Sequence, residues 1–417
     1  MSAIAESGLP RHVVHAKATR LIASAAVTFG VFLSGFVLME PAPYELFLAG
    51  LIGVWALFGL RISRHAALLL SLLIAFNVGG VLSMSTMADL KGAPLYLAVS
   101  LFLAFTAVFF TAIIEADHTR YGLIMGAWIA SGLATGILGI VGYFGLFPGA
   151  DIFTRYGRAT GAFQDPNVFG PFLALPAVFL LHKLVTGNPL KMPGYAAAFL
   201  VIVCAIFLSF SRGAWGLFAS SSALMIAVLF LRSRSGLFRL RLTVMTILAV
   251  ALLVAAILIA LQMPGVGEFF EQRARLVQSY DGGQGGRFAR FGTGFLLATE
   301  RPLGIGILTF FQLFGEDPHN IWLKALMDYG WLGFASFLTI VVWTIAGGFR
   351  ILLRDRPWQP YLLCAYVVFI GHIALATVID IDHWRHFYLL LGLIWGAMAL
   401  ESRHQRELAM RARPRAS

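Results

Sequence analysis

Long apolar runs fill most of this chain and constrain its fold more than any other feature. Apolar residues make up 59% of the sequence and charged residues only 12%, whereas soluble globular chains hold roughly 45–50% and 25%. A run of about 20 apolar residues is long enough to cross a bilayer as a helix. The sequence therefore predicts an all-α polytopic membrane protein, with residues 1–417 forming a single integral membrane domain.

The spacing of these runs predicts about 12 transmembrane helices. An even number places both termini on one side, and most of the 31 Lys and Arg residues fall on that side. The positive-inside rule then predicts that both termini are cytoplasmic. In a bacterial inner membrane, the opposite connections would face the periplasm. The expected runs are 18–38, 45–60, 66–86, 94–114, 121–147, 167–186, 194–210, 213–231, 242–262, 320–349, 359–379 and 385–400.

The net charge of +11 would suggest a nucleic-acid partner if the protein were soluble. In a membrane protein the same excess usually reflects basic cytoplasmic loops. We therefore expect contact with membrane lipid and no nucleic-acid partner.

The longest periplasmic connection, residues 263–319, is expected to be a binding loop or lid. Its Asp281 to Gly286 segment holds four glycines, a composition typical of a flexible hinge. A partly amphipathic stretch follows at 287–299 and predicts a short helix. Loops longer than about 15 residues usually serve binding or closure.

His319 is the leading candidate for catalysis. It stands in Asp317-Pro318-His319-Asn320, where the periplasmic loop meets an apolar run. Imidazole has an unperturbed pKa of about 6.5, which suits proton transfer near neutral pH. Asp317 and Asn320 are candidate supporting residues. The alternative is structural, because Asn320 is a good helix N-cap and the pair could simply begin a helix.

Periplasmic arginines are candidates for an anion site. Arg212 lies in a short break between two apolar runs, and Arg287 and Arg290 lie in the long loop with Arg273 and Arg275. Basic residues on this side oppose the positive-inside trend, and the guanidinium fork matches phosphate oxygens. A phosphate-bearing ligand is therefore expected. For Arg212, snorkelling to lipid headgroups is an equally good explanation.

The segment Gly161 to Asn167 also precedes an apolar run. Its Asp165 and Asn167 are further candidate supporting residues, although Asp-Pro-Asn is most often a turn and helix start. Arg155 and Arg158 are expected to extend the outward basic surface. The sequence shows no phosphate-binding P-loop, metal-ligand spacing or nucleophile elbow. We therefore expect neither a metal nor an organic cofactor.

Four polar motifs follow one another along the chain from residue 161 onward: Gly161–Asn167, Ser211–Ala214, Gly286–Gly306 and His319–Gly333. Together they resemble the O-antigen ligase and polymerase superfamily of bacterial membrane glycosyltransferases. That family often carries Trp where Phe291 stands and Glu where Asp328 stands. The first 150 residues match it only as generic membrane helices.

The resemblance implies a reaction and roles for three residues. Family members transfer a glycan from an undecaprenyl diphosphate carrier to an acceptor hydroxyl at the periplasmic face, without a metal. Direct displacement would invert the anomeric carbon. Arg212 and Arg287 would hold the diphosphate, and His319 would orient or deprotonate the acceptor hydroxyl. Fixed cations in a low-dielectric site stabilise the charge that develops on the leaving diphosphate.

Two questions stay open at the level of sequence. The acceptor could be a lipid A core, as for a ligase, or a growing polysaccharide, as for a polymerase. The dozen helices alone would also suit a transporter or flippase of lipid-linked saccharides. Transporters tend to place ionisable residues and broken helices near the bilayer midplane, whereas the polar motifs here gather at one face. That placement favours an interfacial enzyme.

Overall fold

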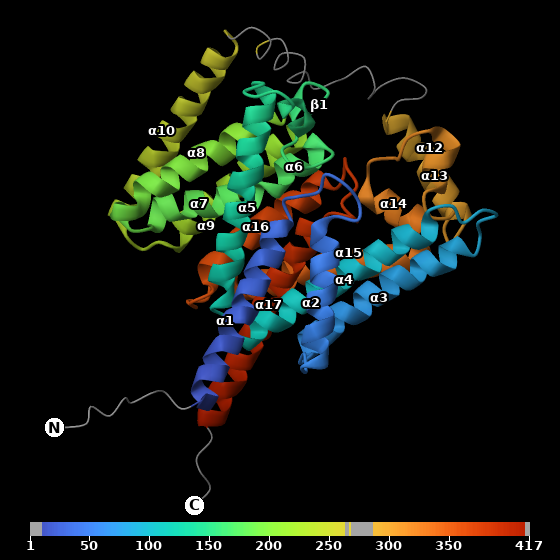
Figure 1. Ribbon diagram of the computed structural model, residues 1–417, viewed down its shortest axis with the longest axis horizontal. Helices are drawn as coiled ribbons and strands as arrows, with labels where there is room; N and C mark the ends of the chain where they lie inside the picture. The colour runs from blue at the N-terminus through green and yellow to red at the C-terminus, as the bar shows by residue number, and fades with distance from the viewer. Residues whose placement is uncertain (1–10, 263–266, 268–286, 413–417) are drawn as a thin grey trace, which may run out of the picture.

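The computed structural model describes residues 11–262, Gly267 and residues 287–412, and these ranges are almost wholly helical (Figure 1). A small antiparallel sheet pairs β1 (Thr154–Arg155) with β2 (Arg158–Ala159). The helices before this sheet are α1 (Arg11–Leu33), α2 (Pro43–Leu57), α3 (Arg64–Met84), α4 (Ala93–Ala116), α5 (Arg120–Tyr143) and η1 (Ala150–Phe153). Those after it are α6 (Pro166–Phe172), α7 (Ala174–Thr186), η2 (Pro189–Lys191), α8 (Met192–Leu208), α9 (Arg212–Arg232), α10 (Gly236–Ala260), α12 (Arg287–Glu300), α13 (Thr309–Phe314), α14 (Ile321–Asp328), α15 (Gly330–Leu352), α16 (Gln359–Leu375) and α17 (Arg385–Ala412).

Seven helical segments within the described ranges are long and apolar enough to cross a membrane. They are α3, α4, α5, α6 with α7, η2 with α8, α9 and α15. Two shorter apolar helices, α2 and α16, accompany them. The fold is that of a polytopic helical membrane protein, as predicted. The total of about 12 spans and the single-domain organisation stay predictions. α12 occupies the stretch expected to be helical, and its function as a lid also stays a prediction.

The expected span at 320–349 has different boundaries in the structure. The chain bends after Asp328, so that α14 is separate and only α15 is a candidate span. Lys324 and Asp328 on α14 are 3% and 2% exposed and are therefore enclosed by protein. Ionisable side chains are costly in lipid, so this enclosure favours a short buried helix over a longer span.

Close packing between α3 and α15 fixes the position of the bend. A Cβ atom added to Gly79 would lie 2.3 Å from the carbonyl oxygen of Tyr329, so only glycine permits this approach. The ring of Phe76 stacks on that of Tyr329, with 3.9 Å between the ring centroids. The C-terminal end of α14 is thereby held against α3.

Gly330 makes the bend itself, and its substitution provides a test of the fold. Its φ is +63°, and a Cβ atom would lie 2.7 Å from the backbone of Leu303. We expect Gly330→Ala to lower the free energy of unfolding by about 1–3 kcal/mol and so to lower the apparent Tm. Gly50→Ala in α2 is the control, because a Cβ atom there would meet nothing within 4 Å. Equal Tm values for the two variants would contradict this role of Gly330.

The two described ends of the chain lie together. Arg20 of α1 pairs with Asp117 at 2.9 Å, and Arg403 of α17 donates to the carbonyl oxygen of Glu115 at 2.5 Å. Both contacts are at the C-terminal end of α4, at the bottom of Figure 1. The start of α1 and the end of α17 therefore lie at the same end of the helical body.

The polar connections gather at the opposite end. Three backbone or side-chain hydrogen bonds join connections that are far apart in sequence: Val37 N to Ala162 O at 2.6 Å, Gly306 N to Ser83 Oγ at 2.9 Å and Ile321 N to Ala376 O at 3.0 Å. The described parts of three predicted motifs, Gly161–Asn167, Gly286–Gly306 and His319–Gly333, take part in these bonds. The fold thus ties these motifs to other connections of the helical body.

Candidate active site

His319 lies in the turn between α13 and α14, outside the helix. Asn320 is the N-cap of α14, and its side chain accepts hydrogen bonds from Trp322 N at 3.0 Å and Leu323 N at 3.1 Å. His319 has a left-handed backbone with φ of +51°, a conformation that is costly for a residue with a Cβ atom. Its side chain is 41% exposed. Capping therefore explains Asn320 but does not explain His319.

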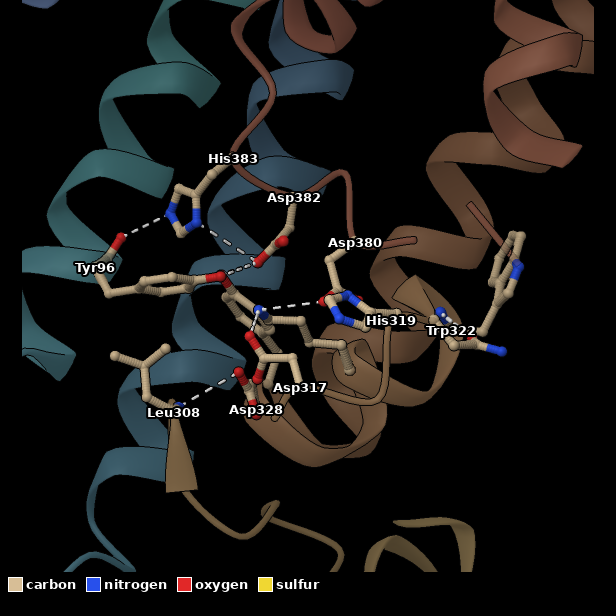
Figure 2. Close-up of polar contacts among 12 residues, drawn as sticks. Tyr96, Leu308, Asp317, His319, Trp322, Asp328, Asp380, Asp382 and His383 are labelled. Atoms are coloured by element: carbon tan, nitrogen blue, oxygen red, sulfur yellow. Dashed lines mark hydrogen bonds and ion pairs between the residues drawn. The ribbon is translucent and has the colours of Figure 1, made fainter. Parts of the chain in front are cut away.

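The imidazole of His319 faces a carboxylate from a distant part of the chain. Its Nδ1 lies 3.8 Å from Oδ2 of Asp380, in the connection between α16 and α17 (Figure 2). The Asp380 side chain is only 13% exposed. Burial raises the pKa of this carboxyl to about 7, and Lys324 opposes part of that rise. Asp380 thus changes its charge near neutral pH, next to the candidate catalytic histidine.

Lys324 is a buried cation beneath this pair. Its side chain is 4% exposed, and its Nζ lies 3.4 Å from Asp317 Oδ2 and 3.9 Å from Asp380 Oδ2. Burial alone would lower the pKa of Lys324, but nearby carboxylates, first of them Asp382, raise it well above its usual value. Lys324 is therefore charged at neutral pH. The expected supporting residue Asp317 pairs with Lys324.

Asp382 anchors the connection that carries Asp380. Its Oδ2 accepts hydrogen bonds from the hydroxyls of Tyr96 at 2.7 Å and Tyr329 at 3.4 Å, and lies 3.7 Å from Nδ1 of His383. Burial disfavours the carboxylate, but Lys324, His383 and the Tyr96 hydrogen bond together lower the pKa of Asp382. Figure 2 shows this group between α4 and the connection. It fixes the backbone from which Asp380 projects.

The motif at 301–306 positions α14 through its buried end, residues 304–306. Ile305 N donates to Met327 O at 2.8 Å, and Gly306 N donates to Ser83 Oγ at 2.9 Å. The first bond holds the end of α14, and the second ties the motif to α3. The motif therefore acts through its backbone hydrogen bonds, which hold α14 in place.

Arg212 lies at the same end of α16 as His319. A Cβ atom on its neighbour Gly213 would be 2.5 Å from Cδ1 of Leu375, so α9 begins against the end of α16. The next residue, Ala376, accepts the hydrogen bond from Ile321 N at 3.0 Å. The Leu375–Ala376 pair therefore has the start of α9 on one side and the start of α14 on the other. Arg212 itself is partly buried.

The loop arginines are placed only in part. Arg287 is the first residue of α12, and its side chain lies outside the described residues. Arg290, one turn later, forms an ion pair with Glu316 and so ties α12 to the turn that carries His319. Arg290 thus supports the position of that turn. Arg273, Arg275 and the expected hinge at 281–286 lie outside the described residues.

The segment before α6 has structural contacts. The Asp165 side chain accepts a hydrogen bond from Asn167 N at 2.7 Å and caps α6, as the turn-and-helix-start alternative predicts. Arg155 is exposed, but Arg158 is only 5% exposed, so the prediction that it extends the basic surface is wrong. Its guanidinium donates to Ser209 O and to Asn167 Oδ1, both at 2.8 Å. Those bonds draw it into the protein and link this segment to the break before α9.

A comparison with protein families bears on this arrangement. Residues 197–338 match the family model described as O-antigen ligase. This segment is therefore similar to the O-antigen ligase family. The resemblance predicted from the motifs is confirmed over the segment, which includes three of the four motifs. No curated protein gives a significant match to the chain. The matched segment contains Arg212, Arg287 and His319, whereas Asp380 lies beyond its end.

The sequence interpretation missed Asp380 and its neighbours. A signal was present, because five ionisable residues stand within seven positions between two apolar runs: Asp380, Asp382, His383, Arg385 and His386. Such density at the end of a span is unusual and marks a functional site more often than a plain connection. The motifs that carry the family resemblance end at Gly333, before this cluster.

Proposed function

We propose that this protein transfers a glycan from an undecaprenyl-diphosphate-linked donor to the hydroxyl of an acceptor sugar, at the periplasmic face of a bacterial inner membrane. The match to the O-antigen ligase family supports a membrane glycosyltransferase of ligase or polymerase type and lipid-linked polysaccharide substrates in general. The observation that carries the proposal is the placement of His319. Its side chain is partly exposed, it faces a largely buried carboxylate, and it shares the end of α16 with Arg212.

His319 would act as the base. Because Nδ1 faces Asp380, the other ring nitrogen, Nε2, would take the proton of the acceptor hydroxyl. The hydroxyl oxygen then forms a bond to the anomeric carbon as the bond from that carbon to the diphosphate breaks. Asp380 is a positioning residue in this scheme. Its negative charge would orient the ring and stabilise the imidazolium that forms.

Arg212 and Arg287 would bind the diphosphate. The electron pair of the breaking bond passes to a diphosphate oxygen, which gains negative charge in the transition state. A guanidinium in a low-dielectric setting stabilises that charge without having to reorganise. Cations in this role would make the reaction independent of metal ions. Attack from the face opposite the leaving group would invert the anomeric carbon.

Reconstitution tests this function directly. The purified protein in lipid nanodiscs is mixed with an undecaprenyl-diphosphate-linked glycan and a soluble acceptor glycan, with and without EDTA. We expect a lengthened acceptor and one undecaprenyl diphosphate released per transfer, at equal rates in both conditions. Loss of activity in EDTA with recovery in magnesium would contradict the role of the arginines. Movement of the donor across a proteoliposome bilayer without transfer would instead identify a transporter.

A further inference from the structure

We propose that Lys324 is a positioning residue that keeps Asp380 anionic and thereby orients His319 for transfer. The inference rests on the proposed function, because it assigns a role within the same site. Lys324 lies five residues after His319 on the buried side of α14, and no motif in the sequence connects it with the reaction. Lys324 and His319 share one carboxylate, that of Asp380.

A single oxygen of Asp380 faces both partners. Its Oδ2 lies 3.8 Å from His319 Nδ1 and 3.9 Å from Lys324 Nζ. Its Oδ1 is buried and has no hydrogen-bond partner among the described residues. A buried carboxylate in this state pays a large desolvation cost when it is charged. A fixed cation beside it offsets that cost. Among the described Lys and Arg side chains, that of Lys324 lies within ion-pairing distance of Asp380.

Other groups around Asp380 make this cation necessary. Lys324 faces it from α14, Asp317 and His319 from the preceding turn, and Asp382 from its own connection. Two of these groups are carboxyls, and the charges of Asp317 and Asp382 favour a protonated Asp380. Without Lys324, Asp380 would therefore take up a proton at neutral pH and would no longer attract the imidazolium of His319.

The geometry also limits what else Lys324 could do. Its ammonium lies 5.2 Å from the centroid of the Tyr96 ring, enclosed between α4 and α14. With a side chain only 4% exposed, it cannot contact a substrate in the described structure. An effect on transfer must therefore act through its neighbours, and Asp380 is the neighbour that faces His319. Such an effect would alter the pH dependence, whereas a packing defect would lower activity equally at every pH.

The test compares pH profiles of kcat for the full-length protein in nanodiscs, using the undecaprenyl-linked donor and acceptor glycan. The wild-type rate should rise as the pH passes through about 7, where Asp380 loses its proton. In Lys324→Met this rise should move up by about one to three pH units, the usual effect of an opposite charge at this distance. Activity at pH 7 should then fall by about tenfold or more and recover in alkali, with little change in KM for the donor. Lys324→Arg, which keeps the charge, should restore the wild-type profile.

Asp380→Asn distinguishes the two residues. It should lower kcat at every pH and give no recovery in alkali, because the amide cannot become anionic. If Lys324→Met does not fold, Lys324→Gln carries the same prediction, and Tm values of all variants report on folding. A uniform loss in Lys324→Met with no shift of the profile would overturn the role of Lys324. His319→Asn is measured alongside, since its full activity would overturn the proposed function, whereas its inactivity with an unshifted Lys324→Met profile would overturn only this inference.

Discussion

His319→Asn is expected to lower kcat for glycan transfer by about 10²–10⁴-fold, the usual contribution of a positioned general base. Asparagine is the most informative replacement because it tolerates the left-handed backbone, with φ of +51°, that His319 adopts. The turn should keep its shape while the proton acceptor is removed. KM for the donor should change little, since the lost interaction forms as the hydroxyl is attacked. The measurement is the rate of undecaprenyl diphosphate release under saturating donor.

A matched control separates catalysis from a general effect of losing a histidine. His404 lies in α17, near the described C-terminal end and far from the site. His404→Asn should transfer glycan at the wild-type rate. The role of His319 would be contradicted if His319→Asn retained more than about a tenth of the wild-type kcat. Equal losses in both variants would also count against it.

Much of the fold could be predicted because its main determinant is local. Apolar runs of sufficient length identify membrane helices without knowledge of their neighbours. Caps are local as well, and the order of polar motifs indicated the similarity to the O-antigen ligase family. The division of the 320–349 run into α14 and α15 was not predicted, because nothing in the sequence distinguishes Gly330 from any other glycine in an apolar run. Its positive φ and the closeness of the Leu303 backbone belong to the tertiary structure, and a helical sequence pattern does not predict them.

The candidate site could be predicted only where one residue carries the chemistry by itself. His319 and Arg212 were identifiable because an imidazole or guanidinium at a membrane boundary is informative alone. Asp317 was expected to support its neighbour His319, but it pairs with Lys324. Because the backbone at His319 is left-handed, adjacency in sequence does not indicate which side chains interact there. Asp380 follows the C-terminal end of α16, and only the fold brings it next to His319. No rule of sequence spacing connects two such positions.

Arg212→Gln is expected to lower kcat by about 10²–10³-fold, comparable to removing one preorganised group that stabilises a developing oxyanion. The charge on the diphosphate increases as the glycosidic bond breaks, so the loss should be larger in kcat than in KM. Arg212→Lys should give an intermediate rate, because it keeps the positive charge but loses the two-pronged hydrogen bonding of the guanidinium. The same release assay measures all three proteins.

The two ends of α9 supply the control. Arg212 is its first residue and Arg232 is its last, where Arg232 forms an ion pair with Asp355 away from the site. If both arginines served mainly to contact lipid headgroups, Arg212→Gln and Arg232→Gln would have similar and small effects on kcat. If Arg212 binds the diphosphate, only Arg212→Gln should lose activity. Its kcat should then improve for a donor whose leaving group needs less charge stabilisation, whereas a lipid-anchoring arginine would show no dependence on the leaving group.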